Sequence, residues 1–313
     1  MLKYLLPKTG KFYKANLHCH TTFSDGRWTP EQVKEEYKAR GYSIVAYTDH
    51  ATRALMATHH ELTDDTFLAM TGYEWEVFML EPWEKDCHLC FVALSPEIDK
   101  DENKPNFSRD YTHENVNNII KVAREDGFFV TYNHPAWSNQ DQADYIGYEG
   151  MHAMEIINYG CIESGYDEYN THVYDDMLRH GKRVYCIATD DNHNARNDSF
   201  GGFTMIKAES LDYKTIGEAL VQGNFYASEA PLIHELTFDT ETRILRVVCS
   251  PVVKVSINTD RISAGVVYPE EGKTLTEAEF TLRTDIKYVR LTVMDEQGKH
   301  ACTNAYFLDE LCK

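Results

Sequence analysis

The sequence predicts an α/β fold with a largely parallel sheet, open or closed into a barrel, followed by a small C-terminal antiparallel β-sandwich. Over about the first 230 residues, short apolar or alternating segments are separated by amphipathic segments, a pattern typical of β/α repeats. From about residue 231, apolar residues alternate with a period of two and no helical period intervenes. We therefore place a domain boundary near residue 230 and expect domains at 1–230 and 231–313.

The individual elements follow from local patterns. The clearest helix begins after Thr29, a capping hydroxyl followed by Pro30 and, three residues after the cap, by Gln32, and it ends at Gly41. Further helices are expected at 113–126, 169–180 and 213–222, each ending before a glycine. Strands are expected at 15–20, 43–50, 67–77, 87–94, 128–134, 153–158, 184–189 and 202–208. In the C-terminal region, residues 253–257, 280–282 and 289–293 alternate as strands do.

Composition narrows the class of protein. The formal net charge of −19 argues against a general nucleic-acid binder, because a polyanionic partner requires a basic footprint. With 42% hydrophobic and 26% charged residues, the chain lies in the ordinary globular range. Eight cysteines are too few for a disulfide scaffold, and the N-terminal residues lack the apolar core of a secretory signal. We expect a cytoplasmic protein with no membrane segment, and the oligomeric state stays open.

Histidines and acidic residues stand near the predicted ends of several strands. Strand alternation would place His18 and His20 on one face and Cys19 on the other, so that two imidazoles could bind one ion. Taken alone, such a pair also fits ordinary packed histidines. It is accompanied, however, by Ser24-Asp25-Gly26, Thr48-Asp49-His50, Gly72-Tyr73-Glu74, His88, Asn133-His134-Pro135 and Asp191-Asn192-His193.

The ends of the strands explain why these motifs belong together. In β/α folds the carboxyl ends of the strands converge on one mouth, where sites are built. Six histidines that all reach this mouth indicate a metal centre more strongly than any one motif does. Neutral imidazoles and carboxylates are ligands suited to zinc, manganese or iron.

The ordered motifs resemble those of the PHP (polymerase and histidinol phosphatase) superfamily over about residues 15–230. The tail from residue 225 into the β-rich end resembles PHP phosphoesterases with a small C-terminal β domain. The resemblance implies a distorted (β/α)7 barrel with a trinuclear metal centre. It implies one ion held by His18, His20, Glu74 and Asp191, a second by Glu74, His88 and His134, and a third by Asp25, His50 and His193. Many members have histidine where this chain has Asp25.

The implied centre suggests a reaction. Three divalent ions bring about +6 and the carboxylates of Asp25, Glu74 and Asp191 return about −3, which leaves a pocket that attracts phosphate. A hydroxide bridging two ions would be the nucleophile, because metal coordination lowers the pKa of water. We expect two to three divalent transition-metal ions and hydrolysis of a small phosphorylated metabolite or nucleotide, with phosphomonoesters favoured over nucleic acid.

Other residues near these motifs have less specific signals. Asp49 is the candidate catalytic carboxylate because it could orient the neighbouring His50, although a solvated or capping role fits its position equally well. Arg27, Arg53 and Arg196 follow the ligand motifs and could clamp a phosphate, whereas simple surface solvation is the alternative for each. Residues 141–167 could cover the site. Residues 231–313 are expected to supply no metal ligand.

Two other functions stay open. Amidohydrolases also begin a barrel with His-x-His, but they usually bridge their metals with a lysine on a middle strand, and Lys121 lies in a predicted helix. An inactive barrel that binds a partner is the other alternative, although such a descendant would be expected to have lost ligands. A zinc ribbon at Cys87-His88-Leu89-Cys90 is disfavoured because no second pair of cysteines has ligand spacing.

Overall fold

The computed structural model describes residues 1–313 except 52–58, 80–83, 97–106 and 263–264. The predicted Arg53 lies outside the described residues. The helices are α1 (Pro30–Ala39), the 3-10 helix η1 (His59–Leu62), α2 (His113–Glu125), α3 (Gln142–Tyr145), α4 (Tyr159–Glu163), α5 (Thr171–Arg179), α6 (Tyr213–Gln222) and α7 (Leu308–Leu311). Among the described residues, no helix has the length and apolar character needed to cross a bilayer.

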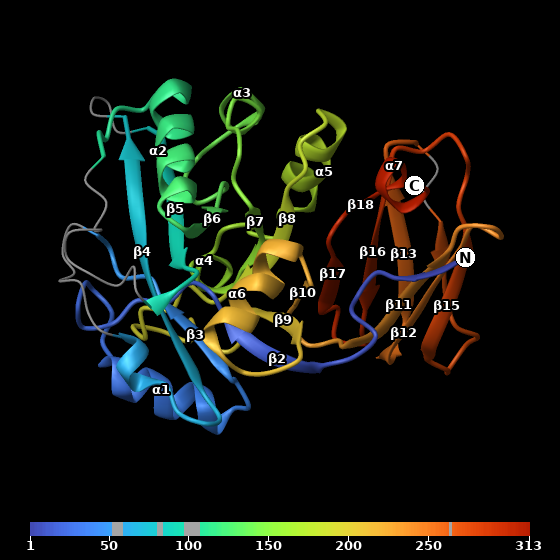
Figure 1. Ribbon diagram of the computed structural model, residues 1–313, viewed down its shortest axis with the longest axis horizontal. Coiled ribbons are helices and arrows are strands. Elements are labelled where there is room, and N and C mark those ends of the chain that lie inside the picture. The colour runs from blue at the N-terminus through green and yellow to red at the C-terminus, as the bar shows by residue number, and fades with distance from the viewer. Residues whose placement is uncertain (52–58, 80–83, 97–106, 263–264) are drawn as a thin grey trace.

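The N-terminal strands form most of one large mixed sheet (Figure 1). Its members are β2 (Lys11–Asn16), β3 (Ile44–Tyr47), β4 (Leu68–Phe78), β5 (Asp86–Ala93), β6 (Phe128–Asn133), β7 (Ala153–Asn158), β8 (Tyr185–Thr189), β9 (Phe203–Ala208) and β10 (Phe225–Ser228). Their order along the sheet is β10-β9-β2-β3-β4-β5-β6-β7-β8. An α/β fold is therefore present, and most strands lie close to the predicted ranges. The first strand is the main exception: it was predicted at 15–20, but β2 ends at Asn16, so His18 and His20 follow the strand instead of alternating along it.

The sheet departs from a closed parallel (β/α)7 barrel in two ways. Strand β5 runs antiparallel to both β4 and β6, and β9 runs antiparallel to β2. The chain connects β4 to β5 through residues 79–85, too few for the crossover that a parallel neighbour requires. In addition, no ladder in the described residues joins β8 to β9, so the sheet is not closed.

The strands nevertheless wrap around a shared interior. One apolar cluster takes side chains from every strand from β2 to β9, and α6 adds Ile216, Ala219 and Leu220 to it. The strand members of this cluster include Ala15, Ile44, Leu68, Met70, Val92, Phe129, Ala153, Ile187 and Ile206. Because side chains alternate between the faces of a strand, the remaining residues of the same parity also point into this interior.

Helices α1, α2 and α5 pack against the outer face, whereas α6 packs into the interior cluster, and several helix ends follow the predicted signals. Thr29 and Gln32 form the capping box of α1, with Gln32 N–H donating to Thr29 Oγ1 and Thr29 N–H donating to Gln32 Oε1. Helix α6 ends at Gly223, whose φ of 72° lies in the left-handed region that glycine adopts at low cost. Helix α2 packs Val116, Ile119 and Ile120 into the outer apolar cluster.

The C-terminal strands are all antiparallel. They are β11 (Ile233–Asp239), β12 (Ile244–Val252), β13 (Lys254–Thr259), β14 (Val266–Val267), β15 (Leu275–Thr281), β16 (Tyr288–Met294), β17 (His300–Thr303) and β18 (Tyr306–Phe307). The N-terminus lies beside them in Figure 1, and β1 (Leu2–Tyr4) pairs with β11. Strands β1, β11, β12 and β15 form a separate four-stranded sheet. An apolar cluster that includes Phe238, Leu245, Val289 and Leu291 lies between this sheet and β16.

The two regions are joined by a ladder as well as by the chain. Strand β17 pairs with β10, with Ala227 opposite Cys302, so the large sheet continues into the C-terminal strands. A buried ion pair adds a further connection: Arg290 on β16 bonds Asp175 on α5 through two contacts of 2.6 and 2.7 Å. The division at residue 230 stays a prediction, and the structure shows that extensive contacts cross it.

Candidate metal centre

Along several strands, the inward-facing residues change from apolar to polar toward one end of the interior. On β4, Leu68 and Met70 belong to the apolar interior, and Glu74 and Glu76 follow at the same parity. On β7, Ala153 is followed by Glu155. Burial of so many ionisable groups is costly unless they are paired or bind metal, so this end of the interior is a candidate functional site.

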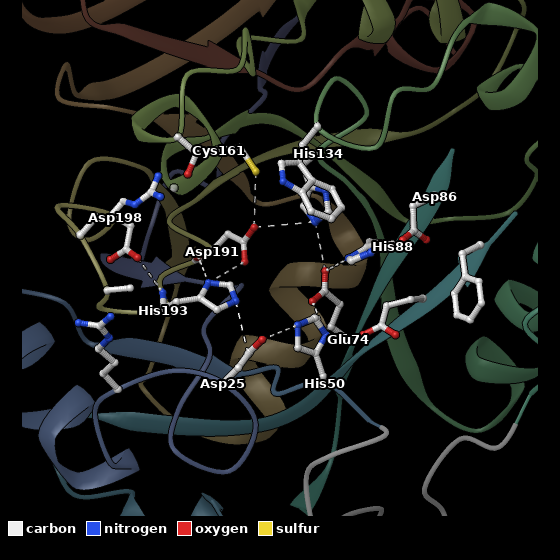
Figure 2. A pocket seen from close by; sticks show the side chains of 18 of the residues that line it. Asp25, His50, Glu74, Asp86, His88, His134, Cys161, Asp191, His193 and Asp198 are labelled. Atoms are coloured by element: carbon white, nitrogen blue, oxygen red, sulfur yellow. Dashed lines mark hydrogen bonds and ion pairs between the residues drawn. The ribbon is translucent and has the colours of Figure 1, made fainter. Parts of the chain in front are cut away.

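Glu74 lies at the centre of this polar end and is 1% exposed. Five imidazole nitrogens surround its carboxylate. Atom Oε1 lies 2.7 Å from His88 Nδ1, 3.1 Å from His134 Nε2 and 3.3 Å from His18 Nε2. Atom Oε2 lies 3.1 Å from His50 Nδ1 and 3.2 Å from His20 Nε2. Figure 2 shows Glu74 of β4 beside His88 of β5 and beside His50 and His134, which follow β3 and β6.

The antiparallel direction of β5 explains how His88 reaches Glu74. His88 is the third residue of β5, so it stands near the start of its strand, whereas Glu74 stands beyond the middle of β4. In the antiparallel register His88 lies opposite Glu76, and on the other side it lies opposite Asn133 at the end of β6. The start of β5 therefore meets the carboxyl ends of its neighbours.

Asp191 is placed by a strained backbone. Its φ of 51° lies in the left-handed region, which is unfavourable for a residue other than glycine, and its N–H donates to His18 O at 3.0 Å. The carboxylate oxygen Oδ1 lies 3.1 Å from His20 Nε2 and 3.2 Å from His18 Nε2. A side chain on Gly160 would collide with Asp190 O at 2.6 Å, so the close approach of α4 to this turn requires glycine.

Asp25, His50 and His193 form the more open side of the site. Asp25 Oδ1 lies 3.5 Å from His193 Nε2 and 3.7 Å from His20 Nδ1, and Asp25 Oδ2 lies 3.5 Å from His50 Nε2. The side chains of Asp25 and His193 are 34% and 32% exposed. Gly26 permits the loop to fold back, because a Cβ there would lie 2.5 Å from His20 O.

The nine predicted ligands thus lie together. Their donor atoms form four groups in which all atoms lie within 4.8 Å of one another: His20, Asp25, His50 and His193; His18, His20 and Glu74; His18, His134 and Asp191; and Glu74, His88 and His134. Each group combines imidazole nitrogens with at least one carboxylate oxygen, and in three of the four groups every member is buried. Imidazole and carboxylate are the ligands that zinc, manganese and iron accept, so the donor set fits divalent metal ions.

The electrostatics of the side chains point in the same direction. Burial lowers the pKa of His20, but Asp191 and Glu74 outweigh it and raise that pKa to about 10. The pKa of His18 is raised against burial by Asp191. Burial raises the pKa of Glu74, whereas His88 and His18 reverse the effect and hold it well below the usual range. In the absence of metal, protons on imidazoles balance the carboxylates, and divalent ions would replace those protons.

Several carboxylates near the imidazoles were not predicted from the sequence. Glu76 Oε1 lies 2.6 Å from His50 Nδ1, and Asp86 Oδ2 lies 3.2 Å from His88 Nε2. The available signal was their spacing, two residues after Glu74 and two residues before His88 on strands. Six carboxylates line the cavity, from Asp25, Glu74, Glu76, Asp86, Asp191 and Asp198, which is more than the three counted from the sequence.

The site opens into a cavity of about 860 Å³. Arg27 and Arg196 line it and are exposed, as expected for groups at its mouth. Phe78, Met79 and Trp137 give the cavity an apolar section. From the segment predicted to cover the site, Gly160, Cys161 and Ser164 also line it.

Asp49 has a different position from the one predicted. Its carboxylate accepts hydrogen bonds from Thr21 N–H at 2.7 Å, Thr21 Oγ1 at 2.7 Å and Ser24 Oγ at 2.6 Å, and it is not among the residues that line the cavity. It therefore holds the loop between His20 and Asp25 instead of orienting the ring of His50. Lys121, the residue weighed for an amidohydrolase, is 71% exposed on α2 and pairs with Glu125.

Comparisons with known proteins give a likeness of fold. The chain has the fold of a two-domain protein from Bacteroides vulgatus that contains a predicted PHP-like metal-dependent phosphoesterase, with a TM-score of 0.50, 16% identity and 98% of each chain covered. A candidate metal-dependent phosphoesterase from Bifidobacterium adolescentis matches with a TM-score of 0.39 and 15% identity, over 70% of this chain and 98% of its own. An amidohydrolase from Chromobacterium violaceum matches with a TM-score of 0.37 and 15% identity, over 57% of this chain and 87% of its own. No family model and no curated protein matches the sequence.

Proposed function

We propose that the protein is a metal-dependent phosphoesterase that hydrolyses a phosphomonoester of a small metabolite or nucleotide. The observation that carries this proposal is the cluster of nine side chains around Glu74, whose carboxylate faces five imidazoles. The fold shared with a protein that contains a predicted PHP-like phosphoesterase supports it.

The donor groups suggest how two to three zinc, manganese or iron ions would be held. Glu74, His88 and His134 would hold one ion, and His18, His20 and Asp191 would hold a second, with Glu74 between them. Asp25, His50 and His193 would hold a third at the open side. When bound, such ions supply an activated water for attack on phosphorus and neutralise the phosphate oxygens.

The cysteine in the cavity supports a reaction without a protein nucleophile. Cys161 is 5% exposed, and burial followed by the charge of Asp191 raises the pKa of its thiol far above the usual range. A thiol of this kind stays protonated, and the thiolate is the nucleophilic form. Attack by water therefore agrees better with the residues of this cavity than attack by Cys161.

Arg27 and Arg196 would be the main groups that select phosphate, because the charges of the metal ions and the cavity carboxylates nearly cancel. Three divalent ions would be matched by the six carboxylates that line the cavity in the described part of the chain, where the remaining positive charge comes from Arg27 and Arg196. A planar guanidinium can form two parallel hydrogen bonds to a phosphate. These two side chains would bind phosphate oxygens at the mouth and orient the ester toward the metal cluster.

The apolar section of the cavity would receive the leaving group. The Trp137 ring lies 5.1 Å from the rings of both His88 and His134, so an ester held at the cluster would have its leaving group near Trp137. The cavity volume of about 860 Å³ is in the range of small-molecule sites. Together with the net charge of −19, it favours a small ester over a long polyanion.

The test combines metal loading with a substrate panel. Metal-free protein would be reconstituted with Zn²⁺, Mn²⁺ or Fe²⁺ and assayed against phosphomonoesters, phosphodiesters, amides and single-stranded DNA. The proposal expects release of phosphate from small monoesters that requires metal and is abolished by His88→Ala. Hydrolysis of amides alone would favour an amidohydrolase, and metal binding without turnover of any class would favour a binding protein.

A further inference from the structure

Glu155 on β7 is a buried carboxylate that the proposed reaction does not use. It is 0% exposed and does not line the cavity. Five donors nevertheless converge on its two oxygens. Oε1 accepts from Thr189 Oγ1 at 2.6 Å, His18 Nδ1 at 2.8 Å and Asn133 Nδ2 at 2.9 Å, and Oε2 accepts from Asn158 Nδ2 at 2.9 Å and the His134 backbone N–H at 3.0 Å.

Three of these contacts lead directly to predicted ligands. Glu155 bonds the ring of His18 and the backbone of His134, and Asn158, which bonds Glu155, also donates to Asp191 Oδ2 at 3.1 Å. His18, His134 and Asp191 form one of the four groups of donor atoms with metal-ligand proximity. A single carboxylate therefore connects all three members of one candidate position.

The contact with His18 determines which ring nitrogen can bind metal. Asn133 Nδ2 also lies 2.9 Å from His18 Nδ1, and it could donate to that nitrogen only if the nitrogen carried no proton. Glu155 Oε1 would then face a lone pair at 2.8 Å, which is repulsive. A proton on Nδ1, shared with Glu155, removes the repulsion and leaves the lone pair of Nε2 directed toward Asp191 and Glu74.

We propose that Glu155 is a positioning residue that fixes the Nδ1–H form of His18 and aligns His18 and Asp191 for the ion that the proposed function assigns to His18, His20 and Asp191. The inference rests on the proposed metal centre. It assigns the control of that ion to a residue outside the cavity, because Glu155 bonds the ring of His18 and, through Asn158, the carboxylate of Asp191. Of His134 it contacts the backbone N–H, and its contacts do not include Asp25, His50 or His193.

The perturbation is Glu155→Gln, which keeps the size of the side chain. An amide places an NH2 group against donors on one side, so either His18 or the pair of Asn158 and His134 N–H loses its acceptor. The matched control is Glu168→Gln. Glu168 is also 0% exposed, but its carboxylate accepts from Trp137 N–H and Asn170 and from no predicted ligand.

Metal content and affinity would be measured on the full chain by elemental analysis and competition with a chelator. We expect Glu155→Gln to bind one ion 10–100-fold more weakly than wild type while the remaining ions bind normally. Glu168→Gln should match wild type. In zinc-loaded protein labelled with ¹⁵N at histidine rings, the signal of His18, identified by its loss in His18→Gln, should show Nδ1 protonated in wild type and change in Glu155→Gln.

The outcomes separate this inference from the proposed function. If wild type binds no metal, the proposed centre is wrong. If wild type binds metal and Glu155→Gln binds all ions equally well with an unchanged His18 signal, the role of Glu155 is refuted. Equal losses in Glu155→Gln and Glu168→Gln would also refute it. If Glu155→Gln does not fold, Thr189→Val, which removes one donor to Oε1, should weaken the same ion several-fold, and unchanged affinity would overturn the inference.

Discussion

Replacement of Glu74 by glutamine tests the shared ligand of the proposed centre. At a metal concentration 100 times the dissociation constant, each ion that binds only the folded state stabilises it by about 2.7 kcal/mol. Two ions that share Glu74 would then contribute about 5 kcal/mol. At about 2–4 °C per kcal/mol, the range for domains of roughly 150–250 residues, these two ions alone should raise the Tm of wild type by roughly 10–20 °C.

Glu74→Gln retains the size of the side chain and removes its negative charge. We expect Glu74→Gln to lose the roughly 10–20 °C that these two ions contribute, since both lose a common anionic ligand, and to keep the contribution of an ion held by Asp25, His50 and His193. The two proteins are compared by the increase in Tm that metal produces, and not by Tm itself, because the Glu74 carboxylate also stabilises the metal-free protein. Folding lowers the pKa of Glu74, so this contribution to stability is present at neutral pH and is lost in acid.

The assay is thermal unfolding followed by circular dichroism, with chelator or with Zn²⁺, Mn²⁺ or Fe²⁺, and Glu168→Gln as the control. Wild type and the control should show the full metal-induced increase. A full increase in Glu74→Gln would refute the shared-ligand arrangement. No increase in wild type with any of these ions would refute the centre itself.

Three further predictions address other parts of the molecule. Asp175→Ala should reduce the free energy of unfolding by about 3–5 kcal/mol in urea titrations, because it leaves the buried charge of Arg290 unpaired, and the double variant Asp175→Ala/Arg290→Met should recover much of the loss. Burial, together with Arg124, lowers the pKa of His152 to about 4. As pH drops from about 6.5 to 4, the unfolded chain binds a proton at this histidine before the folded chain does, so the free energy of unfolding should fall. His152→Gln should remove this part of the pH dependence. Replacing both cavity arginines by methionine should raise KM for a phosphomonoester about tenfold with a smaller change in kcat, and equal kinetics would show that they do not bind substrate.

The sequence predicted the strands well because each is a short apolar segment bounded by turn residues. The range 153–158 agrees with β7, and 202–208 differs from β9 by one residue. The main error was the direction of β5. Apolar periodicity reports that a segment is a strand but carries no information on whether it runs parallel to its neighbours. His88 lies with the other candidate ligands, but the reason given for it from the sequence, the carboxyl end of a parallel strand, does not apply to its strand.

The candidate site was predicted to the extent that its residues form motifs. The nine residues named from the sequence converge. Eight of them stand near or after the carboxyl ends of strands, and His88 stands near the start of the antiparallel β5, at the same side of the sheet. Glu155 was missed because it stands alone within an apolar strand. Its significance comes from donors that are distant in sequence, such as His18 and Thr189, and no spacing along the chain records them.

The open edge of the sheet, along β8, is also held by side chains that are distant in sequence. Among the strands that the structure describes, β8 pairs with β7 alone, and the N–H groups of alternate residues on its other edge are bonded by side chains. Asn304 accepts from Cys186 N–H at 2.9 Å, Thr204 from Ala188 N–H at 3.2 Å, and Asn16 from Asp190 N–H at 3.0 Å. These three side chains satisfy donors that a neighbouring strand would otherwise bond.

This arrangement explains how an unclosed sheet can hold ligands from its two ends in one cluster. Asn16 stands two residues before His18, and Asp190 directly precedes Asp191, so the hydrogen bond between them fixes the first and last ligand motifs relative to each other. Asn304 comes from the C-terminal region and also donates to Phe225 O at 3.0 Å. The β-rich end of the chain thus supplies none of the predicted ligands, yet it helps to hold the strand that carries Asp191 in place.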